Sequence, residues 1–445
     1  GWTLEAASEI CADDSIESWE ILDLISSLVD KSLVVVEMGG TSERYRLLES
    51  TWQYAREKLS EAGESERLNR THAGYFLKVA QAADTAWPST STNAWVAALE
   101  PELANFRAAM GWALVDKHDV GLGAALAGAL KELWVGVGSR VEGLRWIKLA
   151  LDAMRDDQST LTTANLWLAL AINNEGIGAD GEEAAKRALA QAQALDDKAL
   201  TAVALANYAF ALDRRARFDE AETLYLRAAP LLRELGNKKQ LARVLSWWSI
   251  IHFIRRNSEA ARKGFIEALA IARTLDDEVL MATVLGNLAE LAFAEGDVDK
   301  AITTHDEALA LRLKTKNAAG IANAYCNLEA YWLARDDAGK VREYGGKAIY
   351  WGREAQTPLL IAYALQHMAV VGAQEGRAHN AALLLGYVDE TIRQAEFARE
   401  PTEKWSYEKL MAALQKHLNE EEIKALVVEG AGWTEDQAVT EALTI

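Results

Sequence analysis

Small and apolar residues recur at a fixed spacing along the second half of the chain. Three registers, each stepping by 40 residues, are held by Ala, Val or Leu. They are Ala188, Ala228, Ala268, Ala308 and Ala348; Ala221, Ala261, Ala301, Val341 and Ala381; and Leu205, Leu245, Leu285 and Leu365. Small residues let one helix lie close against the next, and leucines fill the groove between pairs. The pattern predicts an all-α solenoid of stacked helical hairpins.

The segments between the predicted helices carry residues that end one helix and begin the next. Leu235-Gly236-Asn237 and Glu295-Gly296-Asp297 place Gly where a helix closes in the left-handed conformation. Thr357-Pro358 puts a cap candidate before a proline at the first helical position. Aspartate pairs at 196–197, 276–277 and 336–337 are predicted at inter-repeat loops, where Asp complements a helix dipole.

The N-terminal segment follows a different pattern. Two short β-rich runs, 32–37 and 44–48, flank Met38-Gly39-Gly40-Thr41-Ser42 and predict a β-hairpin. Helical patterns precede it at 19–29 and follow it at 51–61. Helix, hairpin and helix in this order indicate a small winged-helix-like α+β module over residues 1–75.

The repeated segments resemble the tetratricopeptide (TPR) repeat. Its Ala-x-x-x-aromatic-x-x-Ala second helix is matched by Ala221/Tyr225/Ala228 and Ala261/Phe265/Ala268, and with one substitution by Ala301/His305/Ala308. The standard repeat has about 34 residues, so this longer unit resembles the variant of bacterial regulatory proteins. The resemblance implies a right-handed superhelical solenoid with six repeats over residues 159–397. Linking helices and degenerate hairpins are expected over 76–158, and C-terminal capping helices over 398–445.

The N-terminal module resembles the winged-helix region of STAND-type signal-transduction ATPases. The segments that carry this resemblance are 28–34, 45–50 and 53–55. It implies the sensor and regulatory part of such an ATPase or of a bacterial transcriptional regulator, whose intramolecular partner is an ATPase core outside this chain. The sequence starts at Gly1 without Met, so we expect a fragment of a longer protein.

The charge and composition of the chain disfavour some classes of binding partner. The formal charge of −19 would repel nucleic acid and anionic lipid, and the predicted wing offers few basic residues beyond Lys31, Arg44 and Arg46. Two cysteines, Cys11 and Cys326, fit a reducing cytoplasm. No segment has the apolar length of a membrane helix. Nucleic-acid binding and membrane insertion are therefore not expected.

The sequence offers no catalytic, metal or cofactor site. It has no Gly-x-x-x-x-Gly-Lys-Ser/Thr loop, and its seven histidines form no pair spaced for zinc on one helix. A Gly-x-Gly-x-x-Gly run at Gly176, Gly178 and Gly181 falls in a helix-to-helix turn, outside the strand-to-helix context that a dinucleotide site needs. His305 and Cys326 are predicted to be packed and inert. We expect a binding scaffold and not an enzyme.

The concave face is the candidate site. In TPR superhelices the first helix of each hairpin lines the inner groove, and carrying over those positions selects aromatic, amide and charged side chains. They are Asn173, Asn174, Phe210, Asp213, Arg214, Arg243, Phe253, Glu290, Phe293, Tyr363, Gln366 and Gln374. Two hypotheses remain open: the groove binds a protein or peptide partner, or it binds a small-molecule inducer.

Overall fold

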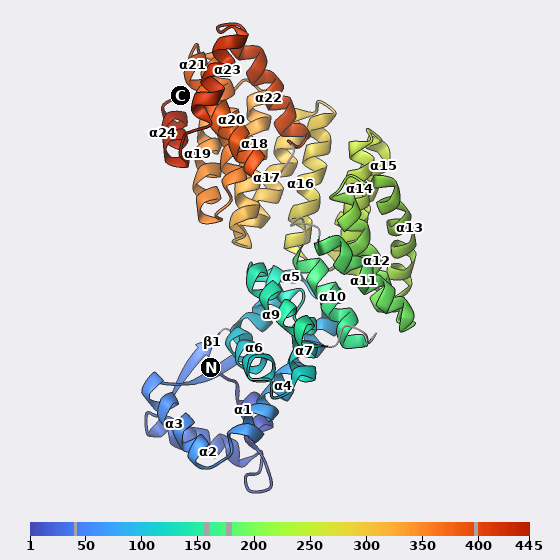
Figure 1. Ribbon diagram of the computed structural model, residues 1–445, viewed down its shortest axis with the longest axis vertical. Helices are drawn as coiled ribbons and strands as arrows, with labels where there is room; N and C mark the ends of the chain where they lie inside the picture. The colour runs from blue at the N-terminus through green and yellow to red at the C-terminus, as the bar shows by residue number, and fades with distance from the viewer. Residues whose placement is uncertain (40–41, 155–159, 175–179, 396–398) are drawn as a thin grey trace. The chain divides into compact units, whose positions relative to one another are not determined.

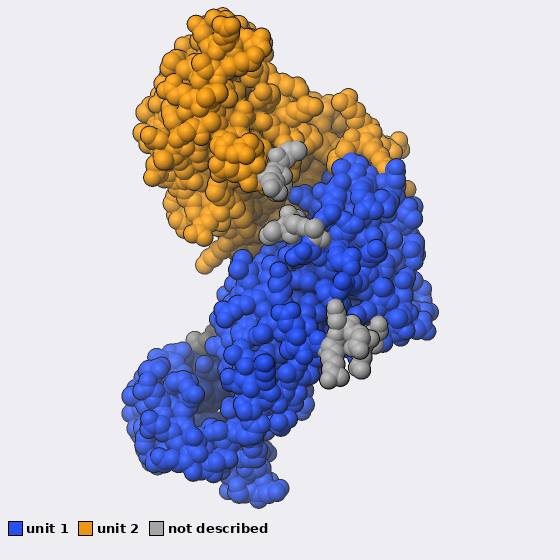
Figure 2. Space-filling model, in the orientation of Figure 1, with its two compact units in different colours: residues 1–251 blue, residues 252–445 orange. Residues whose placement is uncertain are grey.

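The computed structural model of the chain describes residues 1–39, 42–154, 160–174, 180–395 and 399–445. Within them the chain divides into two compact units, unit 1 (residues 1–251) and unit 2 (residues 252–445), coloured separately in Figure 2. Helices dominate both units, and a two-stranded sheet lies in unit 1.

Unit 1 begins with the predicted helix–hairpin–helix module (Figure 1). Helices α1 (Leu4–Cys11) and α2 (Glu20–Asp30) precede strands β1 (Val34–Gly39) and β2 (Ser42–Leu47), and α3 (Glu49–Glu61) follows. The strands are antiparallel, with Val34 opposite Leu47. A small core that includes Ile21, Ile25 and Tyr45 holds α1 and α2 against the hairpin. The predicted α+β module is confirmed, although part of its turn, residues 40–41, lies outside the described residues.

A series of helices of varied length connects this module to the repeats. Its elements are α4 (Ser65–Ala86), η1 (Trp87–Ser89), α5 (Thr92–Leu99), η2 (Glu100–Glu102), α6 (Leu103–Met110), η3 (Gly111–Val115), α7 (Val120–Ala129), α8 (Leu133–Gly136) and α9 (Arg140–Ala153). They enclose a core rich in aromatic rings, in which Trp134 is fully buried and Trp146 is half-buried.

Stacked helices follow in both units. Unit 1 holds α10 (Leu161–Asn173), α11 (Asp180–Ala194), α12 (Lys198–Asp213), α13 (Phe218–Glu234) and most of α14 (Lys238–Ile254). Unit 2 continues with α15 (Ser258–Thr274), α16 (Glu278–Ala294), α17 (Val298–Lys314), α18 (Ala318–Ala334), α19 (Ala338–Glu354), α20 (Pro358–Gln374) and α21 (Ala378–Gln394). We refer to the even-numbered helices α10 to α20 as first helices and to the odd-numbered α11 to α21 as second helices.

The small-residue registers lie where the helices meet. Ala221, Ala261, Ala301, Val341 and Ala381 are all fully buried on successive second helices. The aromatic register is buried too, as Tyr225 and Phe265 show, and His305 takes the same place. Burial lowers the pKa of His305 well below its usual value, so this histidine is a neutral packing residue. The predicted solenoid of stacked helix pairs is confirmed.

One three-residue turn joins these helices again and again. A residue with positive φ recurs every 20 residues: Asp196, Ala216, Gly236, Arg256, Asp276, Gly296, Lys316, Asp336, Gln356 and Gly376. In the α15–α16 turn, the Asp277 amide donates to the Ala272 carbonyl at 3.1 Å, which closes the preceding helix. The Asp277 carboxylate then accepts from the Leu280 amide at 3.1 Å and caps the next helix.

This turn corrects one prediction. Asp336 and Asp337 lie between α18 and α19, inside a hairpin and not at an inter-repeat loop. Turns within and between hairpins share the same geometry, since both join 17-residue helices. The backbone period is therefore 20 residues, half of the 40-residue period of the side chains.

Three further helices complete unit 2: α22 (Pro401–Leu414), α23 (Glu420–Gly430) and α24 (Glu435–Thr444). α23 and α24 pack on α21, the last second helix. α22 packs mainly on the first helix α20 and also touches α21 and the first helix α18. Among the described residues, no helix has both the length and the apolar composition needed to cross a membrane.

Candidate functional site

The predicted lining residues divide between the two units. Unit 1 holds those of α10, the end of α12 and α14: Asn173, Asn174, Phe210, Asp213, Arg214 and Arg243. Unit 2 holds those of the end of α14, α16 and α20: Phe253, Glu290, Phe293, Tyr363, Gln366 and Gln374. In each unit, some of them contact a segment of the chain that is not one of the stacked pairs.

In unit 1 the contacting segment is the loop before α8. The buried Asn173 side-chain amide donates to the Lys131 carbonyl at 2.9 Å. Arg243 Nη1 lies 3.0 Å from Glu132 Oε1, and the Glu132 side chain is almost wholly buried. A charged pair with this little solvent needs close geometry to offset its desolvation. These two predicted residues therefore hold the connecting helices onto the first helices.

Lys239 strengthens the same contact and was not predicted. Its side chain is only 2% exposed, and its ammonium lies 3.5 Å from the centre of the Trp87 ring and 3.3 Å from the Thr92 hydroxyl. Buried cation–π contacts stabilise more than exposed ones. Sequence reasoning missed Lys239 because a lysine near a helix start ordinarily reaches solvent.

The other unit 1 residues lie near the ends of their helices. The Phe210 ring centre is 4.5 Å from that of Trp247 on α14. Asp213 is partly enclosed, and burial raises the pKa of its carboxyl to about 6. Arg214 is exposed, whereas Asn174 is buried.

In unit 2 the contacting segment is α22. The buried Gln366 side chain donates from Nε2 to the Glu403 carbonyl at 2.7 Å and to the Ser406 hydroxyl at 2.6 Å. Its Oε1 accepts from Arg399 Nε at 2.9 Å. Phe293 of α16 meets Trp405 edge to face, with the ring centres 5.2 Å apart. Two predicted lining residues from different repeats thus grip the same helix.

Acidic side chains meet beneath α22. Part of the Glu290 side chain reaches solvent, yet desolvation of its carboxyl, followed by repulsion from Glu400, raises its pKa to about 7. Desolvation likewise raises the pKa of Glu403, to about 8, with Glu400 and Glu290 adding to the effect. Asn327 donates to Glu290 Oε1 at 3.1 Å. Burial therefore favours the neutral form of both carboxyls.

The remaining unit 2 residues surround this contact or lie apart from it. Tyr363 is buried, and desolvation with the nearby Glu403 and Glu400 raises the pKa of its phenol. The Cys326 thiol, also buried, donates to the Leu360 carbonyl at 3.2 Å, and burial raises its pKa well above the usual value. Phe253 is half-buried and Gln374 is exposed at the end of α20. The prediction that Cys326 is packed in the core is confirmed.

A second buried polar pair lies between α18 and α20. His367 Nδ1 is 3.4 Å from Glu329 Oε2, and both side chains are fully buried. Desolvation raises the pKa of Glu329 well above its usual value and lowers that of His367 to about 3. Both are therefore neutral near pH 7. Neither was predicted, since each stands alone in the sequence among apolar neighbours.

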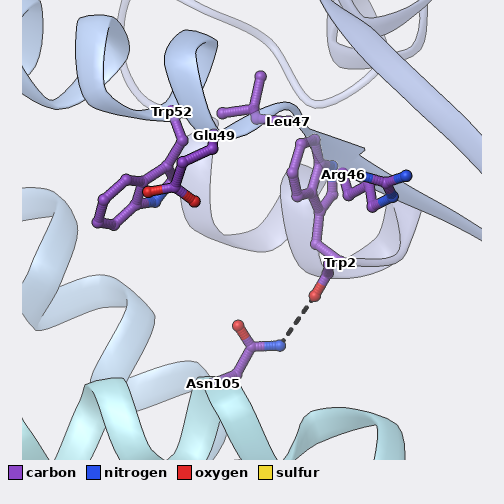
Figure 3. A pocket seen from close by; sticks show the side chains of 7 residues that line it. Trp2, Arg46, Leu47, Glu49, Trp52 and Asn105 are labelled. Atoms are coloured by element: carbon purple, nitrogen blue, oxygen red, sulfur yellow. Dashed lines mark hydrogen bonds between the residues drawn. The ribbon is translucent and has the colours of Figure 1, made fainter.

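One pocket lies on the N-terminal module, away from the predicted lining. It has a volume of about 310 Å³ and is lined by Gly1, Trp2, Arg46, Leu47, Glu49, Trp52 and Asn105. Figure 3 shows Trp2 across from Glu49 and Trp52, with Arg46 beside Trp2 and directed away from them, and Asn105 of α6 below. Asn105 donates to the Gly1 carbonyl at 3.0 Å. The volume is at the small end of the range for ligand pockets.

The remaining candidates for chemistry are a metal site, the basic residues of the wing and the Gly-x-Gly-x-x-Gly run. No group of three His, Cys, Asp or Glu side chains there could hold a metal ion. Two of the three basic residues of the wing are paired with acids, Arg44 with Glu102 and Arg46 with Glu37, and Lys31 is exposed. Of the Gly-x-Gly-x-x-Gly run, Gly176 and Gly178 lie outside the described residues, and Gly181 lies in the first turn of α11.

Comparison with known proteins places the repeats. A family model described as tetratricopeptide repeat matches residues 240–314. A protein of Mycobacterium tuberculosis strain H37Rv, named provisionally as an HTH-type transcriptional regulator, is 30% identical over 286 residues, which cover 62% of this chain and 32% of that protein. The chain thus spans about a third of the length of the curated relatives it matches first.

Solved structures agree on the fold. A STAND protein with a tetratricopeptide repeat sensor from Pyrococcus horikoshii aligns with a TM-score of 0.57 at 17% identity, covering 99% of this chain and 64% of that one. A Rap protein complexed with competence and sporulation factor gives 0.53 at 13% identity, covering 82% and 99%. The chain therefore contains a TPR region, is homologous to HTH-type regulators, and shares its fold with a STAND TPR protein.

Proposed function

We propose that this chain is the partner-binding, regulatory region of a transcriptional regulator of the STAND type. The relative from Mycobacterium tuberculosis supports a role in regulation, and it is about three times as long as the matched segment. The remainder of such a protein would hold the ATPase core and the output domain. A Gly-x-x-x-x-Gly-Lys-Ser/Thr motif upstream of Gly1 in the parent protein would support this part of the proposal.

The observation that carries the binding role is that first-helix side chains accept helical segments. In unit 1 they hold the connecting helices through Arg243 and Lys239, and in unit 2 they hold α22 through Gln366 and Phe293. A surface that seats helices by aromatic and amide contacts has the chemistry of a protein or peptide site.

The small-molecule alternative has a weaker basis. An inducer site needs an enclosed pocket with a few polar groups placed to orient the ligand. A pocket of about 310 Å³ lies on the N-terminal module, beside Trp52, and none of the predicted lining residues lines it. We therefore favour a protein or peptide partner, acting through differential affinity for two states of the parent protein.

Panning the whole chain against a displayed peptide library tests this role. Selected peptides should bind with micromolar or tighter affinity, and hydrogen exchange should slow on first helices when they bind. Arg214→Ala and Glu290→Ala should each weaken binding with helicity intact by circular dichroism. Peptides that protect only the second helices, or that bind both variants like the parent chain, would refute the groove assignment.

A further inference from the structure

α22 crosses three successive first helices of unit 2. It packs along α20 and touches α18, and Trp405 reaches Phe293 on α16. Figure 1 shows α22 among the labelled helices of this unit. A helix that only extended the stack would meet the last pair, α20 and α21, which α22 also touches, but it would not reach α18 or α16. α22 therefore lies over the face that the first helices share, and it covers the side chains predicted to line the groove.

The sequence of α22 suits this position. Its buried residues are Thr402, Glu403, Ser406, Leu410, Ala413 and Leu414, spaced so that they form one stripe along the helix. Lys404 and Glu408 on the opposite side are exposed. The stripe is polar in its first half and apolar in its second. α22 is thus an amphipathic helix seated in a complementary surface, as a helical ligand would be.

Polar contacts hold the first half of α22. Ser406 and the Glu403 carbonyl both accept from Gln366, and Arg399 stacks over Tyr407 at 4.4 Å. At the far rim, the Lys409 ammonium lies 3.5 Å from Asp336. Hydrogen bonds of this kind exchange for bonds to water when the helix leaves, so each contributes modestly to docking.

The same contact contains a conflict. Docking brings Glu403 of α22 toward Glu290 of α16 and buries its carboxyl. Placing a carboxyl among other acids and away from water opposes docking whenever that carboxyl is ionised. α22 is therefore held less firmly than its apolar stripe alone would allow.

We propose that the face formed by α16, α18 and α20 is a helix-binding site, with α22 as its resident occupant. Its partner is an amphipathic helix of another protein that presents an aromatic ring, then a small hydroxyl residue, then an apolar stripe. That helix replaces α22. This proposal rests on the proposed binding role of the repeats and names the class of partner.

A labelled peptide of residues 399–416 tests the site in trans. Fluorescence anisotropy would measure the affinity of this peptide for the unsubstituted chain (the parent chain) and for its variant Trp405→Ala, in which the chain's own α22 is held less firmly. The variant should bind the peptide at least tenfold more tightly, because the resident helix no longer competes at high effective concentration. Adding Phe293→Ala should abolish that gain, and Glu408→Ala, altered on the exposed side, should behave like the parent.

If circular dichroism shows that Trp405→Ala is misfolded, a substitution at Lys409 on the rim of the contact provides a second test. Lys409→Glu places like charges against Asp336 and should tighten peptide binding at least threefold. Adding Asp336→Lys restores the attraction in cis, so affinity should return to the parent level or below. Peptide binding by both single variants no tighter than by the parent would overturn the proposal.

Two further outcomes separate the alternatives. If loosening α22 produced a concentration-dependent doubling of mass by light scattering, the face would bind α22 of a second copy, and the proposed exchange with a different protein would be wrong. If library peptides bind first helices of unit 1 while the α22 peptide binds no variant, the helix site fails and the broader binding role stands.

Discussion

Replacing Glu403 by glutamine should remove a pH dependence from the docking of α22. The folded chain raises the pKa of Glu403 from an ordinary 4.5 to about 8, and that of Glu290 to about 7. A carboxyl whose pKa is raised on folding contributes its stability below its unfolded value and loses it as pH rises through the folded value. α22 should therefore be held best near pH 5 and progressively less up to about pH 9.

The size of the effect follows from the shift at Glu403. One pKa unit corresponds to about 1.4 kcal/mol. Between pH 5.5 and 8.5, an unfolded-state glutamate is mostly ionised while the buried one resists ionisation through most of the range. The free energy of docking should then fall by up to about 3 kcal/mol, and by less if water enters beside the carboxyl. Glutamine matches the neutral acid in shape and cannot ionise, so it makes no pH-dependent contribution to the free energy of docking.

Hydrogen exchange measures this directly. Deuterium uptake by peptides from residues 401–414 would be followed at both pH values in the parent, in Glu403→Gln and in Glu408→Gln. Glu408 is an exposed acid of the same helix, so Glu408→Gln is a matched control. Comparing the variants at the same pH removes the intrinsic pH dependence of amide exchange. Glu403→Gln should keep α22 protected at pH 8.5, while the parent and Glu408→Gln lose protection. Equal loss in all three would refute the reasoning.

Two further predictions concern the stack itself. In α19, Gly345→Ala should destabilise unit 2 by about 1–3 kcal/mol in urea unfolding, because the new Cβ would lie 2.5 Å from Glu329 Oε1. Gly346→Ala should be neutral or slightly stabilising, because its new Cβ would meet nothing within 4 Å. Equal effects of the two substitutions on the free energy of unfolding would contradict this account. Asp297→Ala should lower the free energy of unfolding by about 1 kcal/mol, because it removes the carboxylate that accepts from the Lys300 amide at 3.1 Å. Asp297→Asn should retain most of this helix cap, so an equal loss of stability in both variants would argue against capping.

The stack could be read from the sequence because its determinants are local. Alanine at Ala261 or Ala301 reports a close helix contact wherever it recurs, and Gly236 or Gly296 reports a turn. The half-period of the turns could not be read in the same way. A left-handed residue such as Lys316 or Gln356 carries no turn signal of its own, and only the surrounding helices force it into that conformation.

The sequence selected two side chains that contact a helix in the structure, but it did not indicate which helix they contact. Family geometry put Phe293 and Gln366 on the shared face, and both do contact a helix there. That this helix is α22 depends on long-range packing, which local patterns do not carry. Amphipathic residues 401–414 fit a terminal cap as well as a helix lying across the groove, because both bury one stripe. Lys239 was missed for the same reason, since its partner Trp87 lies far away in the sequence.

The chemistry beneath α22 bears on why it lies there. Sequences that specify one structure ordinarily let each local choice agree with the fold, and conflicts concentrate at functional sites. The apolar half of the α22 stripe, Leu410 with Leu414, follows that rule. Glu403 breaks it, because a glutamine there would satisfy the same space without burying an acid beside Glu290. A helix selected only to cap the solenoid would have no reason to keep this cost. A helix that must leave its seat when a partner arrives gains from it, since the weaker hold lowers the affinity that the partner needs.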